Sequence, residues 1–133
     1  MAVSKYQNDS MLDAALNYIA TADRISVVST SASTMSNYTE LFTTYALITP
    51  HAMTTGAGNG DYTVADGDAG GRKITITAQP TLTVTASATA GGVALGINGT
   101  STVVYVTTCT SQALTSGNTV SIPAWKITLA DAT

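Results

Sequence analysis

Two side chains are of the types that nucleophilic catalysis uses, a thiol and an imidazole. Cys109 and His51 are the only cysteine and the only histidine in the chain, so a thiol–imidazole dyad is the sharpest catalytic hypothesis that these residues allow. A free cysteine is more often a small buried or edge residue of a strand. We interpret Cys109 as such a strand residue and His51 as a loop residue, and we expect no active site at either.

Three aspartates, Asp61, Asp66 and Asp68, lie in a glycine-rich segment whose composition is similar to that of calcium loops. Such loops end in a bidentate glutamate, whereas Glu40 is the only glutamate in the chain. We therefore interpret the three aspartates as turn formers. The glycines within 56–60 precede no predicted helix and match no phosphate-binding motif. We expect no metal and no cofactor.

Carbohydrate chemistry has two candidate features. A glycosidase needs two carboxyl groups in one cleft, but the eight carboxylates lie mostly at predicted turns and helix ends. Trp125, the only tryptophan, offers a platform for a sugar ring, although a lone tryptophan at the start of a strand more often anchors a core. The sequence therefore predicts a protein that is not an enzyme, and leaves a carbohydrate-binding module as an alternative.

Charge excludes several classes of partner. Only 10% of the 133 residues are charged and the net charge is −3. Nucleic acid and anionic membranes both require clustered lysine and arginine, and five scattered basic residues supply no cluster. A hydroxyl-rich surface of low charge is poorly protected against association, which suits a subunit of an assembly. We see no export signal and no transmembrane segment in the sequence.

Two of these candidates, Cys109 and Trp125, belong to an alternating pattern that fills the second half of the chain. From Gly71 almost to the C-terminus, apolar residues alternate with Thr, Ser, Gly or Lys, which predicts strands with one apolar face and one threonine face. We expect Thr83, Thr85 and Thr128 on the outer face. The residues expected to face the core are Leu82, Val84, Val93, Leu95, Ile97, Val104, Val106, Ile122, Trp125, Ile127 and Leu129.

The first half of the chain carries one predicted helix, over 9–22. Its cap is Asn8, Asp9 or Ser10, and its apolar stripe consists of Met11, Leu12, Ala15, Leu16 and Ile19. A strand is predicted over 24–29 and a loop over 30–37. Residues 38–49 fit two periods, and we favour a loop or short helical turn followed by a strand at 45–49. Residues 54–71 predict a long surface loop around a short strand at 62–64.

Turn signals divide the second half. Asn98-Gly99 predicts a type I′ hairpin turn, and weaker turn signals occur at Gln79-Pro80 and at 116–118. Pro123 lacks the backbone donor and predicts an edge strand or a bulge. The predicted fold is mainly β: a single-domain antiparallel β-sandwich or jelly-roll-like barrel with one N-terminal α-helix. Within domain 1–133, we expect a flexible arm at 1–8, the helix at 9–22 and the β domain at 24–131.

Three segments together resemble a family of small virion structural proteins of tailed bacteriophages. They are ALNYIATADRISVVST near the start, DYTVADGDAGGRKITITAQ in the middle, and YVTTCTSQALTSGNTVSIPAWKITLAD at the end. The resemblance covers about 14–131, and it is looser over the glycine-rich stretch 54–60 and over VALGINGT.

The resemblance implies a role in the virion. Family members of this size serve as capsid decoration (cement) proteins or as small tail or tail-fibre-associated subunits. We expect a head decoration protein that forms a homo-oligomer, binds the major capsid protein on the capsid surface and is made in the host bacterial cytoplasm. A tail or tail-fibre subunit is the alternative. No catalytic, cofactor or metal residue follows from the resemblance.

Overall fold

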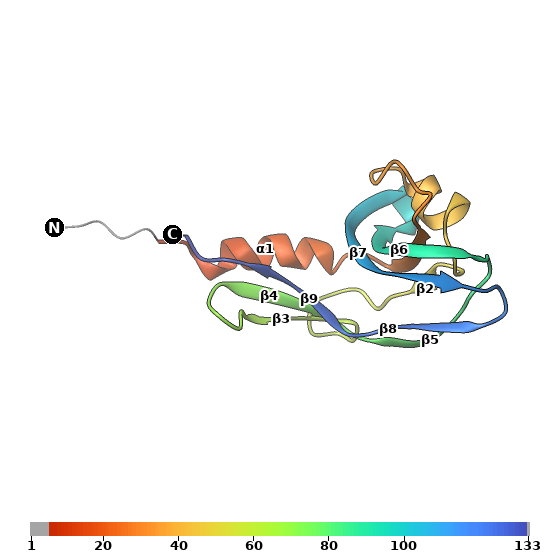
Figure 1. Ribbon diagram of the computed structural model, residues 1–133. Helices are drawn as coiled ribbons and strands as arrows, with labels where there is room; N and C mark the ends of the chain where they lie inside the picture. Colours follow the sequence, from red (N-terminus) through yellow and green to blue (C-terminus); the bar gives the residue numbers. More distant parts are fainter. Residues whose placement is uncertain (1–5, 133) are drawn as a thin grey trace.

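Antiparallel strands dominate residues 6–132, the part of the chain that the computed structural model describes (Figure 1). The fold is mainly β and sandwich-like, with one N-terminal helix, as the alternation predicted. Most of the arm predicted at 1–8 lies outside the described residues. The two layers of the sandwich are one four-stranded sheet and, across the core from it, two smaller sheets.

The N-terminal helix α1 spans Asp9–Ile19 and ends three residues before the predicted limit. Asn8 caps it, because its side-chain oxygen accepts a hydrogen bond from the Ser10 N–H at 2.8 Å. Leu12 and Leu16 are buried against the strands below. Met11 and Ala15 were predicted on the same stripe, but both are exposed, since the helix touches the sheets along one narrow line only.

The four-stranded sheet has the order β2-β1-β6-β7. Its strands are β1 (Arg24–Ser29), β2 (His51–Ala52), β6 (Ala88–Ile97) and β7 (Thr102–Leu114). The hairpin between β6 and β7 confirms the Asn98-Gly99 signal, but the type I′ turn was wrong. The connection is a 3-10 turn over Asn98–Thr100, and the residue with positive φ is Ser101, at 51°. Asn98 and Gly99 both lack the positive φ that a type I′ turn requires.

The second layer contains two small sheets. One is β3 (Tyr62–Asp66), β4 (Arg72–Ile76) and β9 (Trp125–Leu129) in the order β3-β4-β9, and the other pairs β5 (Gln79–Thr83) with β8 (Thr119–Ile122). The chain crosses between them twice, so β4 continues into β5 and β8 into β9 (Figure 1).

Three predictions concern this second layer. Gln79-Pro80 begins a strand and is not a turn, whereas Pro123 does mark the break between two edge strands. The short strand predicted at 62–64 is confirmed as part of β3, but the long surface loop predicted around it was wrong in the second half of 54–71. That half forms the β3–β4 hairpin, in which five residue pairs face each other across the two strands. Tyr62 can be fully buried there because the pairing provides hydrogen-bond partners for the backbone N–H and C=O groups.

β1 and residues 92–96 of β6 are buried on both faces of the four-stranded sheet, which corrects the prediction of one threonine face for β6, whereas 108–113 of β7 are exposed. The inner face of the sheet joins the main core with α1 and both small sheets. Its outer face is covered by η1, a π-helical turn over Glu40–Thr44, whose Leu41 and Phe42 pack on Val28 and Ala94. Gly96 permits this, since a Cβ there would lie 2.7 Å from the Phe42 ring. The helical turn favoured for 38–49 is therefore confirmed.

Most residues expected in the core do contact it. Leu82, Val84, Val93, Leu95 and Ile122 are buried, and Val104, Trp125, Ile127 and Leu129 are half-buried against them. Thr83, Thr85 and Thr128 are exposed, as predicted.

Two members of the expected core lie elsewhere. Val106 packs into the outer cluster instead, because a bulge opposite Leu95 and Gly96 turns both Val104 and Tyr105 inward and reverses the alternation beyond them. Ile97 is half-buried at the hairpin end of β6 and belongs to neither cluster.

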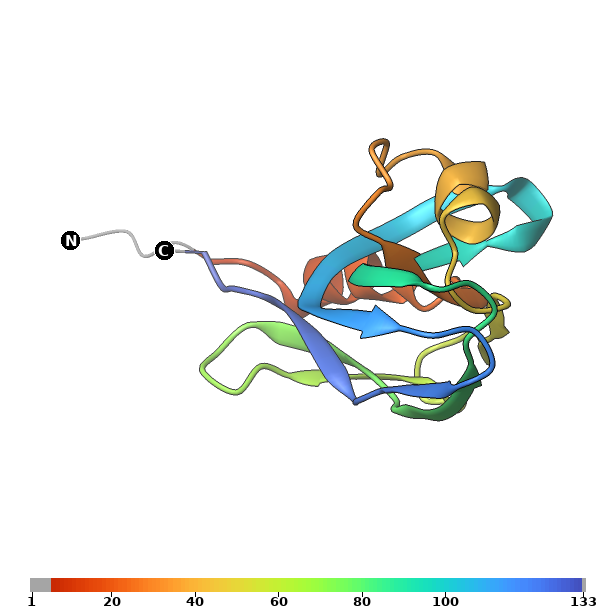
Figure 2. The same cartoon turned by 45° about the vertical axis from the view of Figure 1, so that its right-hand side comes forward.

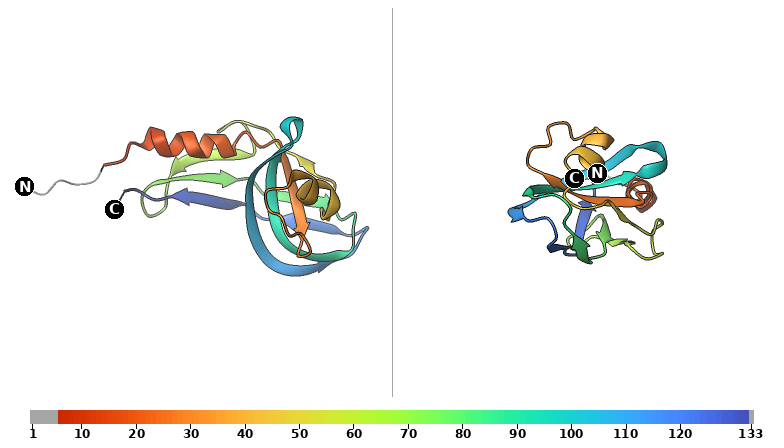
Figure 3. Two further views of the ribbon diagram at one scale, coloured as in Figure 1. Left: turned by 90° about the horizontal axis from the view of Figure 1, so that it is seen from above. Right: turned by 90° about the vertical axis from the view of Figure 1, so that its right-hand side faces the viewer.

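The two layers are joined along one side only. There the predicted strand at 45–49 is reduced to two single bridges, from Ala46 to Val28 in β1 and from Ile48 to Val84 beyond β5. On the other side, the long strand β7 curls toward β8 (Figures 2 and 3). Within residues 6–132, no backbone hydrogen bond joins β7 to β8. The layers therefore form a sandwich that is open along this side, and not a closed barrel.

Candidate functional site

Cys109 and His51 lie at opposite edges of the four-stranded sheet, on β7 and β2, with two strands between them. His51 is a strand residue, which corrects the loop assignment, and it lines a shallow hollow of about 350 Å³ beside Thr81–Thr83. Cys109 is exposed, and partial burial by its neighbours raises the pKa of its thiol. A raised pKa disfavours the nucleophilic thiolate. The two residues do not form a dyad.

The three aspartates of the glycine-rich segment are engaged by donors of the protein itself. The Asp61 carboxylate accepts hydrogen bonds from the Thr54 backbone N–H at 2.6 Å and from the Gln79 side chain at 3.2 Å. Asp66 lies in β3, and Asp68 in the turn after it pairs with the ammonium groups of Lys73 and Lys126. Asp66 and Asp68 thus form ion pairs with side chains of β4 and β9, and Asp61 connects Thr54 to Gln79, where side-chain turns were predicted.

Arg72 of β4 connects the helix α1 to the β3–β4 hairpin. The Arg72 guanidinium on β4 donates to the Asp13 carboxylate of α1 at 2.6 Å and also pairs with Asp66. The hydrogen bond to Asp13 raises the pKa of Arg72, and that to Asp66 adds to the effect. Sequence reasoning missed this contact because 59 positions separate its partners. Within residues 6–132, no three Cys, His, Asp or Glu side chains lie close enough together to hold a metal ion.

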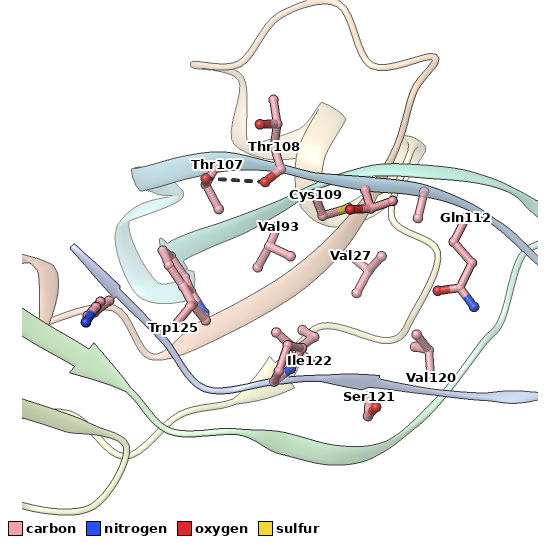
Figure 4. Close-up of a pocket in the computed structure, with 14 residues that line it drawn as sticks. Val27, Val93, Thr107, Thr108, Cys109, Gln112, Val120, Ser121, Ile122 and Trp125 are labelled. Carbon is pink, nitrogen blue, oxygen red and sulfur yellow. Dashed lines mark hydrogen bonds between the residues drawn. The ribbon is translucent and has the colours of Figure 1, made fainter.

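A hollow lies on the open side of the sandwich, and we call it the seam. It has a volume of about 460 Å³. One wall is Thr107–Thr110 and Gln112 of β7, the other is Val120–Pro123 with Trp125 and Lys126, and Val27, Ala90 and Val93 form the floor. Figure 4 shows Val27 and Val93 pointing from the four-stranded sheet toward Ile122. The seam thus separates two strand edges over an apolar floor.

Trp125 closes one end of the seam (Figure 4). Its ring packs on the main core and lies 6.0 Å from the Tyr105 ring at 35°. The core contact confirms the anchor interpretation. Its indole Nε1 is buried and is, among the described residues, the one buried side-chain nitrogen or oxygen without a hydrogen-bond partner. A ring held in this way is no exposed sugar platform, but it carries an unused donor.

A second surface feature lies on the outer side of α1. Met11 and Tyr18 are 65% and 55% exposed, and Tyr6 just before the helix is 85% exposed. Positions 11, 14, 15 and 18 fall on one stripe, since they are spaced by three or four residues. Ala14 and Ala15 are exposed as well. We call this the outer stripe of α1. The sequence analysis did not distinguish it from the buried side, because it placed Met11 and Ala15 on the same apolar stripe as Leu12 and Leu16.

Comparison of the chain with models of known protein families, with characterised proteins and with solved structures finds no match. Among residues 6–132, the helices are too short and too polar to span a bilayer.

Proposed function

We propose that this protein is a non-enzymatic structural subunit of a tailed-phage virion, and specifically a head decoration protein. The observation that carries the proposal is the outer stripe of α1. Three of the four large apolar side chains that are exposed among the described residues, Tyr6, Met11 and Tyr18, lie on or just before this helix. Concentrated apolar exposure of this kind marks an interaction surface.

The helix supports this argument because it is apolar on two sides. Leu12 and Leu16 face the small sheets, while Met11 and Tyr18 face solvent. A helix with apolar residues on both sides is normally covered on both. The outer stripe would be covered in an assembly, by the major capsid protein or by a second copy of this chain.

The remaining surface is compatible with dense packing of subunits. The net charge is −3. Next to α1, the Arg72 guanidinium is paired with the carboxylates of Asp13 and Asp66. Little like-charge repulsion would oppose neighbouring copies on a capsid lattice. Each bound copy adds buried surface that must be broken before the shell opens, and an oligomer multiplies these contacts.

The phage assignment rests on the resemblance of 14–131 to small virion proteins. Copy number separates the head from the tail. Quantitative mass spectrometry of purified particles is expected to give a number of copies that matches a capsid lattice. A handful to a few dozen copies would assign the protein to the tail or a tail fibre.

The binding experiment mixes the protein with undecorated heads and measures occupancy at limiting concentration. The variant Met11→Ser with Tyr18→Ser should occupy fewer sites, and Asn17→Ser, an exposed change on the same helix away from the stripe, should behave like the wild type. Deleting Met1–Gln7 should also weaken retention, because it removes the exposed Tyr6 that precedes the helix. Equal occupancy of the double variant and Asn17→Ser would contradict the role of the stripe.

A further inference from the structure

We propose that the seam between β7 and β8 is a binding site for one extended, uncharged polypeptide segment of a partner protein, which enters as an additional β-strand. This goes beyond the proposed function, because the seam is remote in sequence from the outer stripe of α1 and its lining includes no residue of that helix.

The first argument is the hydrogen-bonding character of the walls. β7 ends the order β2-β1-β6-β7, and β8 pairs only with β5, so each presents one unpaired edge. Unpaired strand edges are templates for another strand. An extended segment between two such edges gains hydrogen bonds on both of its sides.

The second argument is the shape and the polarity of the floor. The volume of about 460 Å³ is within the range of ligand sites. Val27, Ala90 and Val93 form an apolar floor beneath an inserted strand. A purely apolar ligand would leave both strand edges unsatisfied.

The third argument is charge. Lys126 is the only charged residue in the lining, and its ammonium group already pairs with Asp68. A charged segment would lose its hydration in the seam without meeting a counter-charge. The complementary segment is therefore neutral, with alternating apolar and hydroxyl side chains.

The occupant is assigned to another protein and not to a second copy of this chain. Within residues 6–132, the neutral alternating segments are already strands of the three sheets. Donating one of them would unfold the donor. A partner with a spare extended segment meets no such cost.

The single tryptophan makes the test direct, because Trp125 lines the seam and reports its occupancy. The probe is a blocked heptapeptide of alternating threonine and valine, titrated into the full-length protein while tryptophan emission is recorded. We expect a saturable change. The matched control has the same side chains but N-methylated valines, which removes the backbone donors along one edge. Its apparent affinity should be weaker by about tenfold or more, because several hydrogen bonds are lost.

A second comparison locates the binding. Cys109 is exposed on the β7 wall and can carry a bulky maleimide after folding. We expect this label to abolish the saturable change. The control is Cys109→Ser with Thr43→Cys, which carries the same label on an exposed residue of η1, outside the seam lining. It should bind the peptide like the unlabelled protein, and circular dichroism should verify that both labelled forms are folded.

Four results would overturn the proposal: no saturable change with the parent peptide, equal binding of the N-methylated peptide, equal binding after labelling of Cys109, or sedimentation showing that the seam is closed by self-association. The experiment uses no capsids, so its outcome is independent of the decoration role.

Discussion

Replacing Tyr62 by phenylalanine tests the part of the fold that we assigned from a buried hydrogen bond. The Tyr62 side chain is fully buried, and its hydroxyl donates to the Ala22 carbonyl at 2.8 Å. This bond connects β3 to the link between α1 and β1. Among the described residues, no other hydrogen bond to that carbonyl is found. Tyr62→Phe keeps the ring but leaves a buried acceptor unpaired.

The expected cost is about 1 to 3 kcal/mol of unfolding free energy, the desolvation penalty of an unpaired buried polar group. For a chain of this length, each kcal/mol lowers the melting temperature by about 4 °C, so the decrease should be about 4 to 12 °C. Tyr18→Phe is the matched control. Its side chain is 55% exposed, and the change should stay within about 0.5 kcal/mol. Equal melting temperatures for the two variants would refute the reasoning.

The pH dependence of the same variant gives an independent check. Burial raises the pKa of Tyr62 above its ordinary value of 10.0, and the charges of Asp61 and Asp23 add to this. Above about pH 10 the unfolded chain therefore releases the phenolic proton while the native chain retains it. The stability that this group contributes is complete below pH 10 and decreases as the pH rises. Urea unfolding at pH 8 and pH 11 should show a smaller difference between wild type and Tyr62→Phe at the higher pH.

Four further expectations follow from the structure. Gly71→Ala should destabilise by about 2 kcal/mol or more, since φ is +68° and its Cβ would lie 2.0 Å from a backbone carbonyl of β9; Gly99→Ala, in open space, should cost much less. Ile127→Ala should cost about 1 to 3 kcal/mol because its side chain is half-buried. Cys109→Ser and His51→Ala should leave the melting temperature nearly unchanged, since both side chains are exposed. EDTA should also leave it unchanged, and a large decrease would restore the calcium interpretation of the aspartates.

Local signals were sufficient for several elements. The Asn8 cap acts over two residues, so the start of α1 can be read from the sequence, and the β-branched run RISVVS predicts β1 with its observed bounds. Alternation also places Thr83 and Thr128 outside the core. These features depend on neighbours in the sequence, which a pattern can describe.

Burial on both faces of a sheet is not a local property. The pattern of β6 and β7 predicted one apolar face, yet η1 covers the second face through Phe42 packing over Gly96. A single bulge reverses the alternation in β7 and moves Val106 to that outer cluster. Tyr62 is buried because its hairpin is placed under α1, which the glycine-rich composition around it does not indicate.

The sequence by itself determined the class of the fold, the helix with its cap and the scarcity of charge. It also predicted that Cys109 and His51 are ordinary structural residues and that the three aspartates are not calcium ligands. Only the tertiary structure decided that β7 and β8 face each other without pairing, and that Trp125 closes one end of the gap between them. Strand pairing depends on contacts between distant segments, whereas alternation records only which side of its own strand a residue occupies.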